Sequence, residues 1–289
     1  MPDWVSLMST LRVHDINVEA CYMPHSIGGG EISSAWRIDS VDKPVFLKTG
    51  PVSSHDMFLA EADGLKELKK AEALRTPEVL CCDCAGNDSF LALEWIDFEV
   101  ASPIAEAKLG VQLAKQHRFC SDHFGWYRDN TIGSTLQRNP NSNDWIKFLV
   151  EHRLGFQFDL AARNGFRGQL QIDGQKLLNS LAALFYDYWP KPSLLHGDLW
   201  VGNWGVADGD PVLFDPAVYY GDRESDIAMT KLFGGFGDPF YVAYEQTWPL
   251  SSGFNERRLL YQLYHVLNHL NIFGSSYLRR AHNIIKQLL

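Results

Sequence analysis

The chain has 289 residues, of which 46% are hydrophobic and 21% are charged, and its formal net charge is −9. A chain of this length and composition can bury a packed core, which argues against wholesale disorder. Its acidic balance offers no overall positive field to a nucleic-acid backbone, so we expect no nucleic acid among its partners.

Sorting signals and cysteines favour a cytoplasmic location. The segment 1–6 lacks the basic residues and the run of about 7–15 apolar residues that mark a secretory signal. No run of about 18 apolar residues occurs, so we expect no membrane partner. Three of the five cysteines are Cys81, Cys82 and Cys84. They lack a second half at zinc spacing, which favours small buried thiols at a strand end over a metal or disulfide role.

The first hundred residues predict a small lobe that is rich in strands. The expected strands, each a short apolar or alternating run, lie at 18–24, 33–41, 44–48 and 90–93. A run of glycines separates the first two. A helix is expected over 55–71, because apolar residues recur every three or four positions from Phe58 to Leu68.

Beyond residue 100 the pattern becomes helical. Amphipathic helices are expected at 104–119, 142–164, 174–188 and 255–289. A polar loop over 124–140 is longer than most connections in compact domains, which indicates a binding role. We therefore predict an α+β chain with two lobes: a small β-rich lobe over residues 1–97 and a larger, mainly helical lobe over residues 98–289.

The segment 196–203, His-Gly-Asp-Leu-Trp-Val-Gly-Asn, places a carboxylate and a carboxamide five residues apart. Asp215 follows an expected short strand soon after it. Phosphoryl transfer needs a carboxylate to accept the acceptor's proton and hard oxygen ligands for magnesium. The pattern matches the kinase catalytic loop H-R-D-x₄-N with its metal aspartate, with Gly197 in place of arginine. Alternatively, Asp198 and Asn203 could merely stabilise a turn.

Features of the first hundred residues favour phosphoryl transfer over that alternative. The run Gly28, Gly29 and Gly30 can bring backbone amides close to phosphates. Lys48 ends a strand where a cation would reach the α- and β-phosphates. Glu61 lies on the apolar face of the expected helix, and a buried carboxylate there needs a partner such as Lys48.

Glu94, Trp95 and Ile96 leave the strand at 90–93, where their backbone groups could bind an adenine edge. Each of these features is weak alone, but their order along the chain is that of a kinase. The phosphate-binding pattern G-x-x-x-x-G-K-[ST] does not occur in the sequence, so the chain is not expected to be a P-loop NTPase.

The sequence resembles the fructosamine kinase (ketosamine-3-kinase) family, which is related to the aminoglycoside phosphotransferases within the protein-kinase-like fold. The segments that carry the resemblance are Leu-His-Gly-Asp-Leu-Trp-Val-Gly-Asn at 195–203, Phe-Asp-Pro-Ala at 214–217, Tyr-Gly-Asp-Arg-Glu-Ser-Asp at 220–226, Asn-Thr-Ile-Gly-Ser-Thr at 130–135 and Leu-Asn-His-Leu-Asn-Ile-Phe-Gly at 267–274. The resemblance runs from about residue 20 to near the C-terminus.

The resemblance implies ATP- and magnesium-dependent phosphorylation of the 3-hydroxyl of ketosamines, on free amines or on protein lysines. It makes Asp198 the catalytic base. Asn203 and Asp215 become the magnesium ligands, and Lys48 and Glu61 become the pair that positions the phosphates.

The resemblance also implies which residues contact the two substrates. Those implied for ATP are Gly28, Gly29, Gly30, Lys48, Glu61, Glu94, Trp95 and Ile96, the last three at the hinge between the lobes. Those implied for the acceptor are Trp200, Asn130, Thr131 and His269. Trp200 would lie against the sugar, because an aromatic face suits the C–H side of a polyol. It could equally pack beneath the catalytic loop.

Two other functions stay open. A phosphotransferase for another hydroxylated molecule, such as an aminoglycoside, would use the acidic Asp222, Glu224 and Asp226 to bind a polycation, unless these residues cap and pair internally with Arg223. A nucleotide-binding pseudokinase is disfavoured because the full catalytic set is present. The sequence leaves the preferred ketosamine and the oligomeric state open.

Overall fold

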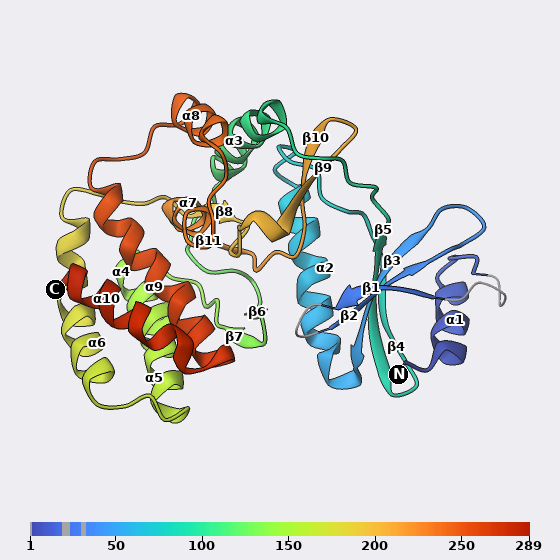
Figure 1. The fold of residues 1–289 in the computed structure, drawn as a ribbon, viewed down its shortest axis with the longest axis horizontal. Helices are drawn as coiled ribbons and strands as arrows, with labels where there is room; N and C mark the ends of the chain where they lie inside the picture. Colours follow the sequence, from blue (N-terminus) through green and yellow to red (C-terminus); the bar gives the residue numbers. More distant parts are fainter. Residues whose placement is uncertain (1, 19–23, 30–32) are drawn as a thin grey trace.

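The computed structural model describes residues 2–18, 24–29 and 33–289, and these form two lobes joined by the segment that follows β5 (Figure 1). Most of the strand expected over 18–24 lies outside the described residues, as does Gly30. The expected α+β architecture, with a small sheet-based lobe and a larger helical one, is confirmed.

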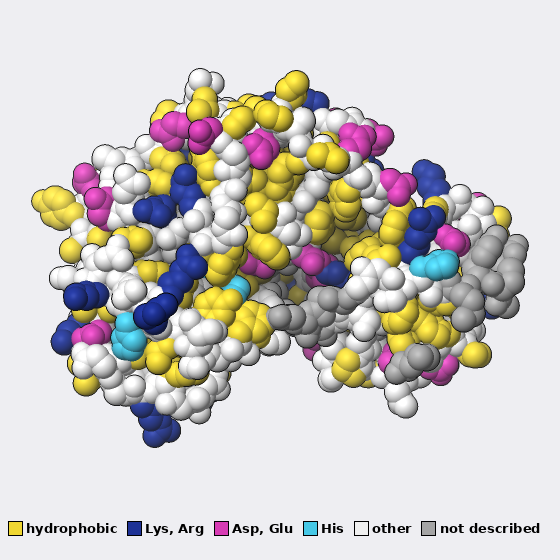
Figure 2. All heavy atoms as spheres, viewed as in Figure 1, with side chains coloured by type: hydrophobic (Ala, Val, Ile, Leu, Met, Phe, Trp, Pro, Cys, Tyr) yellow, Lys and Arg dark blue, Asp and Glu magenta, His cyan; other side chains and the backbone are white. Residues whose placement is uncertain are grey.

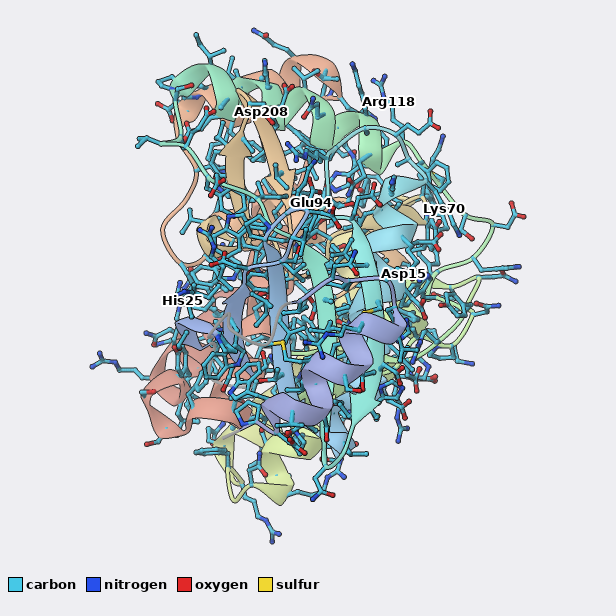
Figure 3. All side chains as sticks on the ribbon, turned by 90° about the vertical axis from the view of Figure 1, so that its right-hand side faces the viewer. Asp15, His25, Lys70, Glu94, Arg118 and Asp208 are labelled. Atoms are coloured by element: carbon cyan, nitrogen blue, oxygen red, sulfur yellow. The ribbon has the colours of Figure 1, made fainter. Side chains whose placement is uncertain are left out.

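The smaller lobe is built on a five-stranded antiparallel sheet in the order β1-β2-β3-β5-β4. Its elements are α1 (Trp4–Val13), β1 (His25–Gly29), β2 (Ser34–Ile38), β3 (Val45–Pro51), α2 (His55–Lys69), β4 (Val79–Ala85) and β5 (Asp88–Glu94). Side chains alternate along β5: Phe90 and Ala92 pack with α1, whereas Leu91 and Leu93 pack with α2. Helix α2 therefore lies between the sheet and the other lobe, and α1 crosses the opposite face (Figures 1 and 3).

The larger lobe is mainly helical. Its helices are α3 (Pro103–His117), α4 (Trp145–Phe148), a π-helix (Leu149–Leu154), α5 (Gly155–Arg163), α6 (Gln169–Ser180), α7 (Glu224–Thr230), α8 (Asp238–Thr247), α9 (Phe254–Phe273) and α10 (Leu278–Leu288). Three two-stranded ladders pair β6 (Asn130–Ile132) with β7 (Thr135–Gln137), β8 (Ser193–Leu195) with β11 (Tyr219–Gly221), and β9 (Trp204–Ala207) with β10 (Asp210–Leu213). The largest core cluster of the molecule lies here, and α9 and α10 contribute much of it.

The expected helices are present, with bounds set by local chemistry. Helix α3 begins at Pro103 because the Ser102 hydroxyl accepts a hydrogen bond from the Ala105 backbone. The helix expected over 174–188 starts earlier, at Gln169. Gly174 lies inside it because a Cβ there would come within 2.6 Å of the Phe158 ring. The helix expected over 255–289 is interrupted after α9.

Several elements were not anticipated from the sequence. Helices α1, α7 and α8 are present, and so is β4, while the loop expected over 124–140 contains the β6–β7 hairpin. The cysteine cluster lies within β4 rather than at a strand end. Cys81 packs with the α1 side of the sheet and Cys82 with the α2 side, and burial raises the pKa of each thiol to about 12.

The described residues contain neither a membrane-spanning helix nor a cluster of acidic, histidine or cysteine side chains that could hold a metal ion. No helix there is both long and apolar enough to cross a bilayer. No group of three or more His, Cys, Asp or Glu side chains in that part of the chain is arranged to hold a metal ion, and this includes the cysteines of β4.

Candidate active site

A cavity of about 890 Å³ separates the lobes. Figure 2 shows it as a hollow with charged side chains of both signs at its bottom. The structure brings together around it Lys48, Glu61, Asn130, Thr131, Asp198, Trp200, Asn203, Asp215 and His269. Elements that are far apart in the sequence all border this cavity: β3, α2, the β6–β7 hairpin, the segment 196–203 and α9.

The residues expected at the hinge do not line the cavity. Glu94 accepts a hydrogen bond of 2.8 Å from the Arg75 guanidinium, which also reaches Asp208 in the other lobe at 3.2 Å. Figure 3 labels Glu94 below Asp208. The Trp95 indole donates to Asp97 at 2.8 Å. Two hinge side chains therefore have other partners, which leaves backbone groups for any nucleotide contact there.

Gly28, Gly29 and Ile96 are likewise absent from the cavity lining that the described residues form. The two glycines belong to β1 rather than to a free turn, and β1 pairs with β2 through an irregular register between Ser26 and Gly29. Gly28 has a φ of 92°, a conformation that suits glycine.

Lys48 bridges two carboxylates at the bottom of the cavity. Its Nζ lies 2.7 Å from Glu61 Oε1 and also donates to Asp215 Oδ1. Lys48 and Glu61 are only 11% and 13% exposed, whereas Asp215 is 46% exposed and therefore accessible to a ligand. The pairing that the helix periodicity suggested for Glu61 is present.

Burial and charge determine how these three groups titrate. Burial lowers the pKa of Lys48, but Glu61 and Asp215 outweigh that effect and raise it above its ordinary value. Burial raises the pKa of Glu61 to about 7, even though Lys48 opposes the shift. Burial also acts to raise the pKa of Asp215, yet the Lys48 ammonium holds that pKa below its ordinary value.

The loop that carries Asp198 is held in place through its backbone N–H groups, which donate to Asp226. Asp226 of α7 accepts hydrogen bonds from the His196 and Gly197 backbone nitrogens at 2.8 and 2.9 Å. Gly197 has a φ of 85°, and a Cβ on it would lie 2.0 Å from the Ala217 carbonyl oxygen. This position therefore requires glycine, which explains the absence of the arginine that protein kinases have there.

Asp198 is a carboxylate with a raised pKa. Burial is the main cause, the nearby Asp215 charge adds to it, and together they raise the pKa of Asp198 to about 7. Asn203 Nδ2 donates to the Asp198 backbone oxygen at 2.9 Å and lies 3.3 Å from the side-chain Oδ2 of Asp198. The use of Nδ2 in these contacts leaves Asn203 Oδ1 as its possible ligand atom for a cation.

Helix α2 is clamped to the helical lobe on the side next to Glu61. Asp63 accepts hydrogen bonds from the Tyr127 hydroxyl at 2.7 Å and from Arg128 at 2.5 Å. The next residue, Gly64, approaches Val218, whose Cγ2 would lie 3.2 Å from an added Cβ. These contacts fix the helix that carries Glu61, and no pattern in the sequence indicated them.

Trp200 packs against the segment 196–203 and also borders the cavity, so its contact with a sugar stays a prediction. Its ring lies over Gly202, where an added Cβ would be 2.4 Å from Trp200 Cη2, so one side packs against the catalytic segment. The residue nevertheless remains 37% exposed and lines the cavity.

Asn130 is used inside the protein. Its Nδ2 donates to the Val218 carbonyl at 2.7 Å, and its Oδ1 accepts from Gln137 and Asn139, both at 2.9 Å. The carboxamide therefore fixes the β6–β7 hairpin against residues 217–218. Thr131, beside it, is only partly buried.

The acidic segment 222–226 is buried and internally paired. Glu224 forms two hydrogen bonds with Arg257, at 2.7 and 3.0 Å, and Asp222 accepts from the Tyr188 and Tyr261 hydroxyls. Pairing with Arg223 was one alternative that the sequence left open, but Arg223 instead donates to the backbone carbonyls of 248 and 249. The acids therefore form no pocket for a polycation.

Other lining residues were not identified from the sequence as part of the site. They are mainly apolar and aromatic: Ser33, Met57, Phe58, Met229, Phe233, Asn268, Ile272, Phe273, Ser276 and Tyr277. One signal was available, because His269, Phe273 and Tyr277 recur at intervals of four residues, which places the first two on one helical face.

Comparisons with known proteins show the family of the chain. The sequence model of a family described as fructosamine kinase matches residues 4–289. A probable ketoamine kinase of Synechocystis is 40% identical over 91% of this chain and 89% of its own length. A protein-ribulosamine 3-kinase of Oryza sativa subsp. indica, described as chloroplastic, is 41% identical over 91% and 78%.

Solved structures agree with the fold. A Haemophilus somnus protein assigned as a fructosamine-3-kinase superposes with a TM-score of 0.90 at 30% identity, covering 99% of this chain and 97% of that one. Aminoglycoside phosphotransferases share the same two-lobed arrangement at much lower identity, and the expected protein-kinase-like fold is confirmed.

Proposed function

The chain belongs to the fructosamine kinase family, and from this premise we propose that it transfers the γ-phosphoryl group of ATP to the 3-hydroxyl of a ketosamine. The observation that carries the proposal is the convergence of Lys48, Glu61, Asp198, Asn203 and Asp215 on one cavity between the lobes. A pseudokinase would not need this complete set.

Asp198 is the base in this reaction. Its carboxylate takes the proton of the acceptor hydroxyl, whose oxygen then bonds to the γ-phosphorus while the bond from that phosphorus to the β-phosphate oxygen breaks and ADP leaves. A pKa of about 7 suits a base that works near neutral pH. Lys48, held by Glu61, supplies a positive charge for the α- and β-phosphates.

The residues present fit a magnesium ion. Asp215 offers a carboxylate that is 46% exposed to the cavity, and Asn203 offers a carboxamide oxygen, both hard ligands of the kind magnesium prefers. When bound there, magnesium would neutralise phosphate charge. Asp215 would exchange part of its contact with Lys48 for the metal.

Recognition of the two substrates divides between the lobes. Backbone groups of Gly28, Gly29 and the hinge at Glu94–Ile96 serve the nucleotide, and Gly30 belongs with them by sequence. Trp200, Thr131 and His269 face the acceptor. Asn130 acts through the hairpin it fixes, because its carboxamide is already fully engaged.

A ribulosamine or fructosamine is the acceptor we favour, as a small molecule or as an adduct on a protein lysine.

The four described cysteines are free thiols, which accords with a reducing cytoplasm. The acids at 222–226 give no support to an aminoglycoside, because their carboxylates are already hydrogen-bonded within the protein.

The decisive experiment measures ADP release with ATP and magnesium in the presence of an N-alkyl ribulosamine, an N-alkyl fructosamine or kanamycin, with phosphorus NMR to locate the new ester. Ester formation at carbon 3 of a ketosamine supports the proposal. Asp198→Asn should lower kcat by at least about a hundredfold, while Asp187→Asn, an exposed acid outside the cavity lining, should not. Turnover of kanamycin but of neither ketosamine would refute it.

A further inference from the structure

One side of the cavity is an aromatic wall, formed by Phe233, His269, Phe273 and Tyr277. The His269 ring lies 4.6 Å from the Phe233 ring, 5.3 Å from Phe273 and 5.1 Å from Tyr277, centroid to centroid. His269 and Phe273 share a face of α9, Tyr277 follows in the next turn, and Phe233 comes from the segment after α7. Three aromatic rings from two parts of the chain therefore pack around the His269 ring.

The wall is held rigidly but is left open to the cavity. Asn268 Nδ2 donates to the Ile132 carbonyl at 3.2 Å, which ties α9 to the β6–β7 hairpin. The His269 ring is fixed by a 2.8 Å hydrogen bond from its Nδ1 to the His265 carbonyl. Phe273 is nevertheless 43% exposed. A large apolar ring left open in a cavity is explained by a ligand that covers it.

Charge in the cavity is confined to the catalytic end. Among the lining residues that the structure describes, the carboxylates are Glu61, Asp198 and Asp215, and each is engaged with Lys48, Asn203 or one another. No carboxylate belongs to the aromatic wall in the described part of the chain. Arg280, which does not line the cavity, lies over the Phe233 ring at 5.4 Å from its centroid and donates to the Leu232 carbonyl. A cation that enters from the cavity would therefore meet ring faces rather than an acid, and Phe273 and Tyr277 would contribute more than Phe233.

We propose that the aromatic wall binds the amine-bearing substituent of the acceptor and holds its ammonium through cation–π contacts with Phe233, Phe273 and Tyr277. This inference rests on the proposed function. The secondary amine of a ketosamine carries one positive charge near neutral pH, attached to carbon 1 of the sugar and two carbons from the reacting hydroxyl. Aromatic faces attract such a cation without the strong hydration that a carboxylate keeps.

The wall also determines what the enzyme accepts on the nitrogen. Aromatic and aliphatic faces favour apolar N-substituents, because burying them removes apolar surface from water. A polycation would leave most of its charges without partners, and a carboxylate on the substituent would face the electron-rich ring faces. We therefore expect singly charged ketosamines with apolar substituents to be the preferred class.

The test compares two acceptors that differ at one atom: 1-butylamino-1-deoxyribulose, which carries an ammonium with two N–H donors, and the corresponding 1-O-butyl ether, which has nearly the same shape and no charge. The wild-type protein should favour the amine by about tenfold or more in kcat/KM. Phe233→Leu, Phe273→Leu and Tyr277→Leu keep an apolar side chain, and each should reduce that preference about threefold to tenfold, mainly through KM. Tyr186→Leu, an aromatic residue that is 88% exposed and lies outside the lining, is the matched control.

The outcomes separate the inference from the function on which it rests. If the wild type phosphorylates the amine but the three leucine variants keep the full preference, the wall does not hold the ammonium and only this inference fails. The same conclusion follows if the wild type uses amine and ether equally well. If neither compound is phosphorylated, the proposed function fails, and the inference fails with it. Unchanged KM for ATP in the variants shows that the nucleotide side is intact.

Discussion

The indole of Trp200 lies directly over Gly202, so closely that a Cβ atom on the glycine would be 2.4 Å from Trp200 Cη2. Gly202→Ala should push the ring into the cavity and raise the KM of the acceptor by about tenfold, with little change in the KM of ATP. Steady-state kinetics with each substrate varied in turn measures this. In a Trp200→Leu background the same alanine should have almost no further effect. An equal effect in both backgrounds would show that Gly202 acts without Trp200.

Asp198 should make the folded protein less stable as the pH rises. Its pKa is about 7 in the folded state and near 4 when unfolded, so the folded state binds more protons between these values. Stability from this group is complete below about pH 4 and is lost by about pH 7. Asp198→Asn should therefore be more stable than the wild type at pH 8, by on the order of a few kcal/mol at most, with a difference that disappears toward pH 4.

Denaturant unfolding of both proteins across that pH range checks the prediction. Asp187→Asn should show no such pH dependence, since this exposed acid lies outside the cavity. A wild type that gains stability relative to Asp198→Asn as the pH rises would contradict it.

Removing Lys48 alone should lower the free energy of unfolding more than replacing Lys48 and Glu61 together. Lys48→Ala leaves the Glu61 carboxylate, which is 13% exposed, without its cation, and should lower the free energy of unfolding by on the order of 3 kcal/mol. Lys48→Ala combined with Glu61→Gln should recover part of that loss, because the buried charge is gone. Both proteins should lose turnover, so the comparison is made by urea denaturation. A double variant less stable than the single one would argue against the pair.

Asp63 should affect catalysis although it does not line the cavity. Asp63→Ala removes the acceptor for Tyr127 and Arg128 and releases α2 from the helical lobe. Glu61 would then hold Lys48 less well, so the KM of ATP should rise about threefold to tenfold. Asp56→Ala is the control on the same helix, since only its backbone oxygen contacts Arg128. Identical kinetics for the two variants would remove the clamp from the account.

The parts of the site that could be predicted from sequence are those whose chemistry is carried by residue type and spacing. The interval between Asp198 and Asn203 and the apolar surroundings of Glu61 required only the sequence and the helical period. The ring contacts of Phe233 with His269 could not be found this way, because 36 residues separate them and apolar side chains give no sign of which cavity they face. The functional roles of all these residues, and a lobe boundary at residue 97, stay predictions.

The elements of the fold likewise include some that the sequence predicts and some that it does not. Long periodic helices such as α3 and α9 were predictable, whereas the seven-residue α7 was not, because it is buried on every side and has no amphipathic pattern. The break after α9 at Gly274, whose φ is 86°, depends on one residue inside a continuous apolar rhythm. Asp226 illustrates the limit: the sequence offered it for binding a polycation or for pairing with Arg223, yet it anchors the loop that carries Asp198 from a buried position.

Helices α9 and α10 have a consequence for how the protein is made. Leu260, Leu263 and Leu267 of α9 lie in the main core of the helical lobe, alongside α4 and β8, which are synthesised much earlier. On the ribosome the catalytic loop therefore emerges before the core that must hold it. The nascent chain then carries Lys48, Asp198 and Asp215 while the α9 side of the cavity that they line is still missing.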